Sequence, residues 1–122
     1  MRVLIGSLLA LGLTAATIVA QVSTGTLWIY YVDTEGGQAT LFVAPSGESL
    51  LVDTGNPGAR DTDRLMLALE DAGVRQIDHL VLTHYHGDHI GGLSELAKRI
   101  AIKRFYDHGP TAEGDRAGSQ GF

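Results

Sequence analysis

The chain has 122 residues, 44% of them hydrophobic and 19% charged, and this balance fits one small folded domain rather than a disordered chain. The formal net charge of −5 argues against nucleic acid as a partner, because a phosphate-binding surface needs an excess of Lys and Arg. The chain contains no cysteine, which excludes disulfides and thiolate ligands and leaves His, Asp and Glu as the strong metal-binding side chains.

An apolar segment begins the sequence. Residues 3–19 carry no charge, Arg2 precedes them, and Ala20 offers a small residue at their end. This pattern predicts a secretory signal peptide over residues 1–20, and therefore an exported protein, periplasmic or secreted. An uncleaved membrane anchor is the alternative, since about 18 apolar residues are also enough to span a bilayer. We favour the signal peptide because no basic cluster follows the apolar segment.

Three strands are predicted next. Residues 26–33 and 38–44 are rich in aromatic and β-branched side chains, and the apolar residues 49–53 follow a Pro-Ser-Gly turn at 45–47. The turn makes an antiparallel hairpin the simplest arrangement for the second and third strands.

The second half of the chain alternates helices and strands. A helix is predicted from residues 61–63, whose side-chain oxygens suit a helix cap, up to Gly73. An apolar strand at 77–83 then leads into a histidine-rich loop, and a helix at about 90–99 and a short strand at 100–106 follow. The order β-β-β-α-β-α-β indicates an α/β (α+β) fold.

The composition changes after residue 110. Glycines and polar residues replace the apolar pattern, so residues 111–122 are predicted to form a Gly-rich loop. The predicted helices cover one face of the sheet, and the other face of such a sheet also needs a cover. We therefore expect residues 21–110 to be the N-terminal part of a domain that is truncated before its remainder.

The residues Thr-His-Tyr-His-Gly-Asp-His at 83–89 form a candidate metal site. His84 and His86 are two positions apart, so in extended backbone their side chains project the same way and can chelate one ion. Asp88 and His89 follow a glycine and can form a second pair beside the first. The alternatives are solvated loop histidines and, for Asp88, a carboxylate that only caps the next helix.

These residues resemble a known signature. The segment 83–92 is similar to the HxHxDH element of the metallo-β-lactamase superfamily, and 49–55 resembles that family's strand ending in an Asp-x-Gly turn. Residues 37–40 and 45–47 resemble the metallo-hydrolase domain of competence-type DNA-uptake proteins. The resemblance covers about residues 26–110 and implies the N-terminal half of an αββα sandwich.

The resemblance also implies roles for single residues. His84 and His86 match the ligands of a first metal, Asp88 and His89 match those of a second, and Asp88 would also orient the attacking water. Asp53 matches an acid beside the site, although a carboxylate at a turn could equally serve only nearby backbone amides. The family's later ligands, a His, a bridging Asp and a last His, have no matching position here.

Two further histidines are weighed separately. His108 follows the last predicted strand, and strand ends at one sheet edge gather around sites, so it is a candidate on the substrate side of the centre. His79 lies early in its strand, and we expect it to be a packed or half-exposed structural histidine.

The resulting functional prediction is a zinc-type hydrolase with two Zn²⁺ ions in the complete domain. A metal-activated water would attack an ester, lactone, amide or phosphodiester of a small-molecule substrate. One alternative is a truncated, inactive half-domain that binds metal weakly or not at all. Another is an exported nucleic-acid-processing domain, which only the competence-type likeness suggests.

Overall fold

The computed structural model describes residues 25–110. The elements follow in this order: β1 (Trp28–Tyr31), β2 (Thr40–Val43), β3 (Ser49–Val52), α1 (Ala59–Asp71), β4 (His79–Val81), α2 (Gly87–Ile90), α3 (Leu93–Arg99) and β5 (Phe105–Tyr106). The predicted order is confirmed with one addition, the short helix α2 between β4 and α3.

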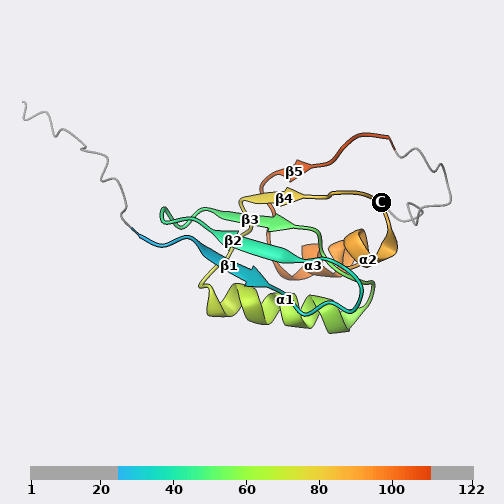
Figure 1. Cartoon of the computed structure of the whole chain (residues 1–122), viewed down its shortest axis with the longest axis horizontal. Coiled ribbons are helices and arrows are strands. Elements are labelled where there is room, and N and C mark those ends of the chain that lie inside the picture. The colour runs from blue at the N-terminus through green and yellow to red at the C-terminus, as the bar shows by residue number, and fades with distance from the viewer. Residues whose placement is uncertain (1–24, 111–122) are drawn as a thin grey trace, which may run out of the picture.

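The five strands form one sheet in chain order (Figure 1). β1 pairs with β2 and β2 with β3 in the antiparallel sense, which confirms the predicted hairpin of the second and third strands. β3 pairs with β4 and β4 with β5 in the parallel sense. A parallel pair needs a crossover, and α1 makes the crossover between β3 and β4. The carboxyl ends of β3 and β4 therefore lie at the same edge of the sheet.

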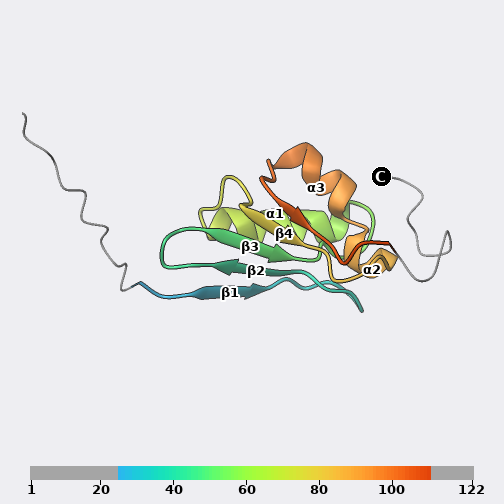
Figure 2. The ribbon, with the colours of Figure 1, turned by 90° about the horizontal axis from the view of Figure 1, so that it is seen from above.

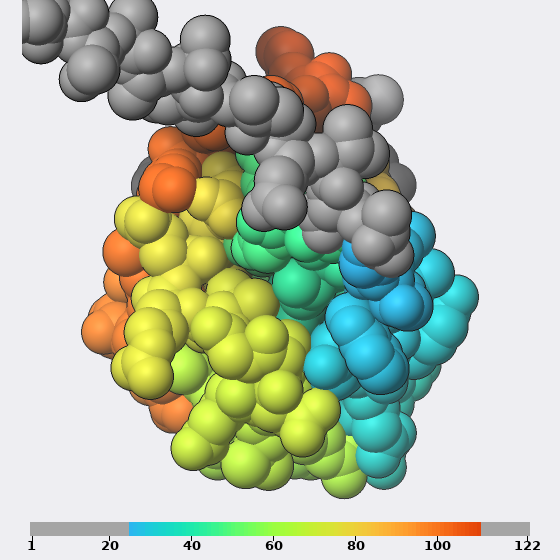
Figure 3. All heavy atoms as spheres, turned by 90° about the vertical axis from the view of Figure 1, so that its left-hand side faces the viewer, coloured from blue at the N-terminus to red at the C-terminus, as the bar shows by residue number. Residues whose placement is uncertain are grey.

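One hydrophobic core lies between the sheet and its helices (Figures 1 and 2). Leu65 and Leu69 of α1 and Leu96 of α3 are almost completely buried, and they belong to the same cluster as Leu41 and Leu80 of the sheet. Burial of each such side chain stabilises the fold by about 2 kcal/mol. Seen from the end of the sheet where β1 begins, α1 and the segment that follows it fill one side and β1 the other (Figure 3).

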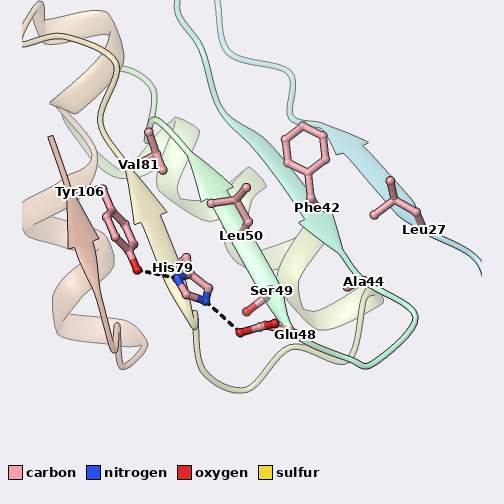
Figure 4. Close-up of a pocket in the computed structure, with 9 residues that line it drawn as sticks. All are labelled: Leu27, Phe42, Ala44, Glu48, Ser49, Leu50, His79, Val81 and Tyr106. Carbon is pink, nitrogen blue, oxygen red and sulfur yellow. Dashed lines mark hydrogen bonds and ion pairs between the residues drawn. The ribbon is translucent and has the colours of Figure 1, made fainter. Parts of the chain in front are cut away.

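No helix within residues 25–110 covers the opposite face of the sheet. Phe42, Leu50 and Val81 stand on this face, with the helices behind the sheet (Figure 4). Ile29, the strand partner of Phe42, is 42% exposed. The chain is thus a mixed sheet with helices on one side, and it matches the predicted N-terminal half of a metallo-β-lactamase sandwich.

Three predicted boundaries are wrong for physical reasons. α1 begins at Ala59 without a side-chain cap, because the buried carboxylate of Asp61 accepts the backbone N–H of Asn56 instead. The helix predicted at 90–99 is two helices, because the Gly92 N–H donates to the Gly55 carbonyl at 3.2 Å while the Asp88 carbonyl accepts the Gln38 N–H. The last strand has two residues, and Ile102 makes only an isolated bridge.

A polar contact joins the starts of β3 and β4. The carboxylate of Asp78 accepts the backbone N–H of Ser49 at 2.9 Å and the Lys103 ammonium at 2.6 Å. These hydrogen bonds lower the pKa of Asp78 to about 2, and the bond from Lys103 has the largest effect. The contact ties β3 and the segment before β5 to the beginning of β4.

This contact predicts a pH-dependent contribution to stability. A carboxyl whose pKa is lower in the folded protein stabilises the fold above its unfolded pKa and loses that effect as pH falls through its folded pKa. We expect Asp78 to contribute about 1 to 2 kcal/mol at neutral pH, lost between about pH 4 and pH 2. Urea unfolding of the wild type and Asp78→Asn at pH 7 and pH 2.5 measures it. The gap between them should shrink at low pH, and an equal gap at both would contradict the assignment.

Two predicted segments lie outside the described residues, namely the signal peptide or anchor over 1–20 and the Gly-rich loop over 111–122. Within residues 25–110, no helix combines the length and the apolar character needed to cross a membrane.

Candidate metal centre

Two segments meet at the carboxyl ends of the parallel strands. The chain after β3 runs beside the histidine loop after β4, because the Asp53 N–H donates to the Val81 carbonyl at 2.9 Å and the Thr54 N–H to the His89 carbonyl at 2.7 Å. Gly55 and Ile90 then form a parallel bridge. The predicted Asp-x-Gly turn and the predicted histidine loop are therefore hydrogen-bonded neighbours.

The loop between β1 and β2 closes the same edge. The Gln38 N–H donates to the Asp88 carbonyl at 3.1 Å, and the Gly55 N–H donates to the Gln38 carbonyl at 2.9 Å. Gly37 is in such close contact that an added Cβ would overlap the Asp88 carbonyl oxygen. Two loops from distant parts of the chain, the β1–β2 loop and the segment after β3, thus hold the backbone of the histidine loop.

Asp53 is the buried anchor of this arrangement. Its side chain is 0% exposed, and its backbone lies in the left-handed region at φ 58°, where few residues other than glycine, Asn and Asp are found. Its Oδ1 accepts the Thr83 N–H at 2.8 Å, while its Oδ2 accepts the Thr83 hydroxyl at 2.6 Å and lies 2.8 Å from Nδ1 of His89. One carboxylate therefore holds the start and the end of the histidine loop together.

The predicted ligand side chains lie close to one another. The ring centroids of His84 and His89 are 3.9 Å apart, and those of His84 and His86 are 4.7 Å apart. Nε2 of His89 is 3.7 Å from Oδ2 of Asp88. Asp88 lies within α2, whose N-terminus has no side-chain cap, so the structure gives no support to a capping role for its carboxylate.

The donor types fit a divalent ion of the zinc kind, for which imidazole nitrogen and carboxylate oxygen are the usual ligands in a chain without cysteine. The fit is incomplete in this part of the molecule. Among residues 25–110, no three or more His, Asp or Glu side chains are arranged to hold one ion. The four residues of the loop form a partial cluster rather than a closed coordination shell.

The remaining two histidines, His79 and His108, are not members of this cluster. The ring of His108 is 4.9 Å from that of Tyr85, whose hydroxyl donates to the Gly109 carbonyl at 2.8 Å. His108 thus lies beside the histidine loop, on its tyrosine. His79 is bonded to Glu48 and Tyr106, as expected of a structural histidine.

An apolar pocket of about 520 Å³ lies on the uncovered sheet face, away from the histidine loop (Figure 4). Phe42, Leu50 and Val81 line it, and His79 and Tyr106 border it. The histidine loop and this apolar pocket therefore lie at different places on the molecule.

Thr83 is the residue at this site that we missed in the sequence. Its hydroxyl oxygen lies between Asp53 Oδ2, at 2.6 Å, and His84 Nδ1, at 3.1 Å. A hydroxyl residue directly before the first histidine was the available signal, but its partner Asp53 is thirty positions away.

Comparison with known proteins agrees with this geometry. The sequence profile of the metallo-beta-lactamase superfamily matches residues 33–121. The chain belongs to the metallo-beta-lactamase superfamily. The resemblance inferred from the HxHxDH element and the Asp-x-Gly turn is thereby confirmed.

Several curated proteins of this kind are similar to the chain. A metal-dependent hydrolase of Staphylococcus carnosus is 32% identical over 83 residues, which are 64% of this chain and 34% of that protein. The atrochrysone carboxyl ACP thioesterase of Aspergillus terreus is 37% identical over 62 residues, which are 51% of this chain and 19% of that protein. A beta-lactamase-like protein 2 homolog of Caenorhabditis elegans is 29% identical over 68 residues, which are 56% of this chain and 23% of that protein. The matched part thus spans between about a fifth and a third of each relative.

Proposed function

We propose that this chain carries part of the metal centre of a hydrolase, with His84, His86, Asp88 and His89 as metal ligands. One observation supports this most strongly. The buried Asp53 holds Nδ1 of His89, while Nε2 of the same ring lies 3.7 Å from the Asp88 carboxylate. A histidine whose second nitrogen is fixed by a carboxylate is the common arrangement at metal centres, because it sets the ring orientation and makes the ligand more basic.

The proposed ion is Zn²⁺, with two ions in the complete domain. When bound, such an ion supplies a Lewis acid and lowers the pKa of a water molecule. Residues of the chain position the histidine loop and the attacking water. Asp53 and Thr83 hold the loop, and the partly exposed Asp88 carboxylate can accept a hydrogen bond from the attacking water and so orient it.

The proposed substrate is a small molecule with an ester, lactone, amide or phosphodiester bond. The name of the Aspergillus terreus relative, a thioesterase, supports attack on an acyl carbonyl. Export of the protein through residues 1–20 is a further part of the proposal, and it rests on the sequence pattern alone.

A second candidate is a half-domain without turnover. A catalytic zinc ion generally has three protein ligands, whereas the loop offers two donors for each of two ions. No larger ligand set occurs among residues 25–110, and the match covers at most about a third of the relatives named above. Under this candidate the chain binds metal weakly and catalyses nothing by itself.

Metal removal tests both candidates. For the hydrolase, the purified chain should retain zinc after dialysis, and its hydrolysis of a panel of chromogenic esters and phosphodiesters should stop with chelator and return with added zinc. Metal content by mass spectrometry and initial rates are the measurements. Weak zinc binding without turnover would favour the half-domain, and hydrolysis that survives exhaustive chelation would overturn the metal-dependent proposal.

A further inference from the structure

The hydroxyl group of Thr83 lies at the centre of a hydrogen-bond network that includes two of the proposed ligands. Its oxygen is 2.6 Å from Oδ2 of Asp53, 3.1 Å from Nδ1 of His84 and 3.5 Å from Nδ1 of His89. Nδ1 of His89 is also 2.8 Å from the same Asp53 oxygen. Nδ1 of His89 therefore lies near both the carboxylate and the hydroxyl, whereas Nδ1 of His84 contacts the hydroxyl.

The chemistry of these groups fixes the direction of each hydrogen bond. An ionised carboxylate only accepts hydrogen bonds, so the Thr83 hydroxyl donates its single proton to Asp53. The same hydroxyl can then only accept from its other neighbour, so Nδ1 of His84 must carry a proton. Nδ1 of His89 must carry one too, because it faces the Asp53 carboxylate. In both neutral rings the lone pair available to a ligand is then on Nε2.

We propose that Thr83 is a positioning residue that, together with Asp53, fixes His84 and His89 in the Nδ1–H tautomer and so presents both Nε2 atoms for metal binding. Asp53 alone explains His89, since it contacts that ring directly. Thr83 is needed to explain His84, which reaches the carboxylate only through the hydroxyl. The importance of these tautomers for metal binding rests on the proposed function, but the tautomers themselves do not.

His79 is an internal reference, because its hydrogen bonds require the other neutral tautomer. Nε2 of His79 is 2.9 Å from the Glu48 carboxylate, and its Nδ1 is 3.0 Å from the Tyr106 hydroxyl (Figure 4). By the same reasoning the carboxylate requires a proton on Nε2, and the tyrosine hydroxyl donates to Nδ1. His79 should therefore adopt the Nε2–H tautomer in the same sample in which His84 and His89 adopt the other.

Nuclear magnetic resonance of the metal-free 122-residue chain tests the proposal. Long-range ¹H–¹⁵N correlation of ¹⁵N-histidine at about pH 8.5, two units above the usual imidazole pKa of about 6.5, identifies the protonated nitrogen of each neutral ring. We expect Nδ1–H for His84 and His89 and Nε2–H for His79. Nε2–H, or an even mixture, at His84 would overturn the proposal whether or not the chain binds zinc.

Two variants separate the hydroxyl from the rest of the side chain. Thr83→Val keeps the shape and removes the hydroxyl, so His84 should lose its Nδ1–H preference while His79 keeps its signals. Thr83→Ser keeps the hydroxyl and should retain the wild-type tautomer. An unchanged His84 in Thr83→Val, or a Ser variant that behaves like the Val variant, would overturn the role of the hydroxyl.

Zinc affinity gives a second and separate measurement. Loss of an outer hydrogen-bond partner of a metal ligand typically weakens binding about 10–100-fold, and Thr83→Val should weaken zinc binding by about tenfold or more in competition with a chromophoric chelator. Equal affinity of the Val variant and the wild type would contradict the proposed effect on binding. A wild-type chain that shows the expected tautomers but binds no zinc would refute the proposed function and leave the tautomer assignment intact.

Discussion

Replacement of Asp53 by Ala is expected to lower the free energy of unfolding by about 2–3 kcal/mol. The side chain is completely buried and accepts hydrogen bonds from the Thr83 N–H and the Thr83 hydroxyl and contacts Nδ1 of His89. A buried polar group left without its partner costs about 1–3 kcal/mol, and Ala removes the acceptor for all three donors, although the two donors of the exposed Thr83 can turn to water. Ala also tolerates the left-handed backbone at φ 58° less well than Asp does. Urea unfolding followed by circular dichroism measures the loss.

Asp53→Asn refines this experiment. Its carbonyl oxygen can still accept the Thr83 N–H, and Asn tolerates the left-handed region, but its amide group cannot accept from the hydroxyl and from His89. An intermediate loss of about 1–2 kcal/mol is therefore expected. Asp33→Ala is a matched control, because the Asp33 side chain is 80% exposed and forms a surface ion pair with Arg64. If Asp53→Ala unfolds like Asp33→Ala, Asp53 does not anchor the loop.

The features that local patterns determine were predicted well from the sequence. The apolar strand before the histidines and the Pro-Ser-Gly turn predicted β4 and the β2–β3 hairpin, and the structure confirms both. The HxHxDH spacing predicted that His84, His86 and His89 would be neighbours, and their rings lie within 5 Å of one another in two pairs. Their role as metal ligands stays a prediction.

The features that depend on tertiary contacts were not accessible in the same way. At the break between α2 and α3, the Gly92 N–H donates to the carbonyl of Gly55, which belongs to the loop after another strand. Thr83 acquires its role only because parallel pairing of β3 and β4 brings Asp53 next to it. The resemblance placed Asp53 near the site. It did not predict the three groups that Asp53 contacts, because local sequence patterns carry no information about contacts between residues thirty or more positions apart.

Which face of the sheet the helices cover also depends on tertiary packing. Alternation along β2 and β3 puts Phe42 and Leu50 on one face and Leu41 and Leu51 on the other. Leu41 and Leu51 are fully buried under the helices, whereas the first two line the pocket on the open side. The pattern alone predicts two apolar faces, and the structure identifies which of them residues 25–110 cover.

Loss of His84 and His86 is expected to have the largest effect on metal binding. These side chains are proposed to be the two protein ligands of the first ion, and their rings lie 4.7 Å apart. Removing only an outer hydrogen-bond partner of a ligand already weakens binding by about 10–100-fold, so the double variant His84→Ala/His86→Ala should weaken zinc binding by at least about 100-fold. Calorimetric titration of the purified chain with zinc measures the affinity and the number of ions.

The chain offers two histidines as matched controls. His79 is bonded to Glu48 and Tyr106 on the open face, and His108 lies against Tyr85, so neither belongs to the cluster. The double variant His79→Ala/His108→Ala removes the same number of imidazoles and should leave zinc affinity within about threefold of wild type, because surface substitutions away from a site usually change free energies by less than about 0.5 kcal/mol. An equal loss in both double variants would mean that zinc binds to histidines at large, and the histidine loop would then have no claim to be the metal centre.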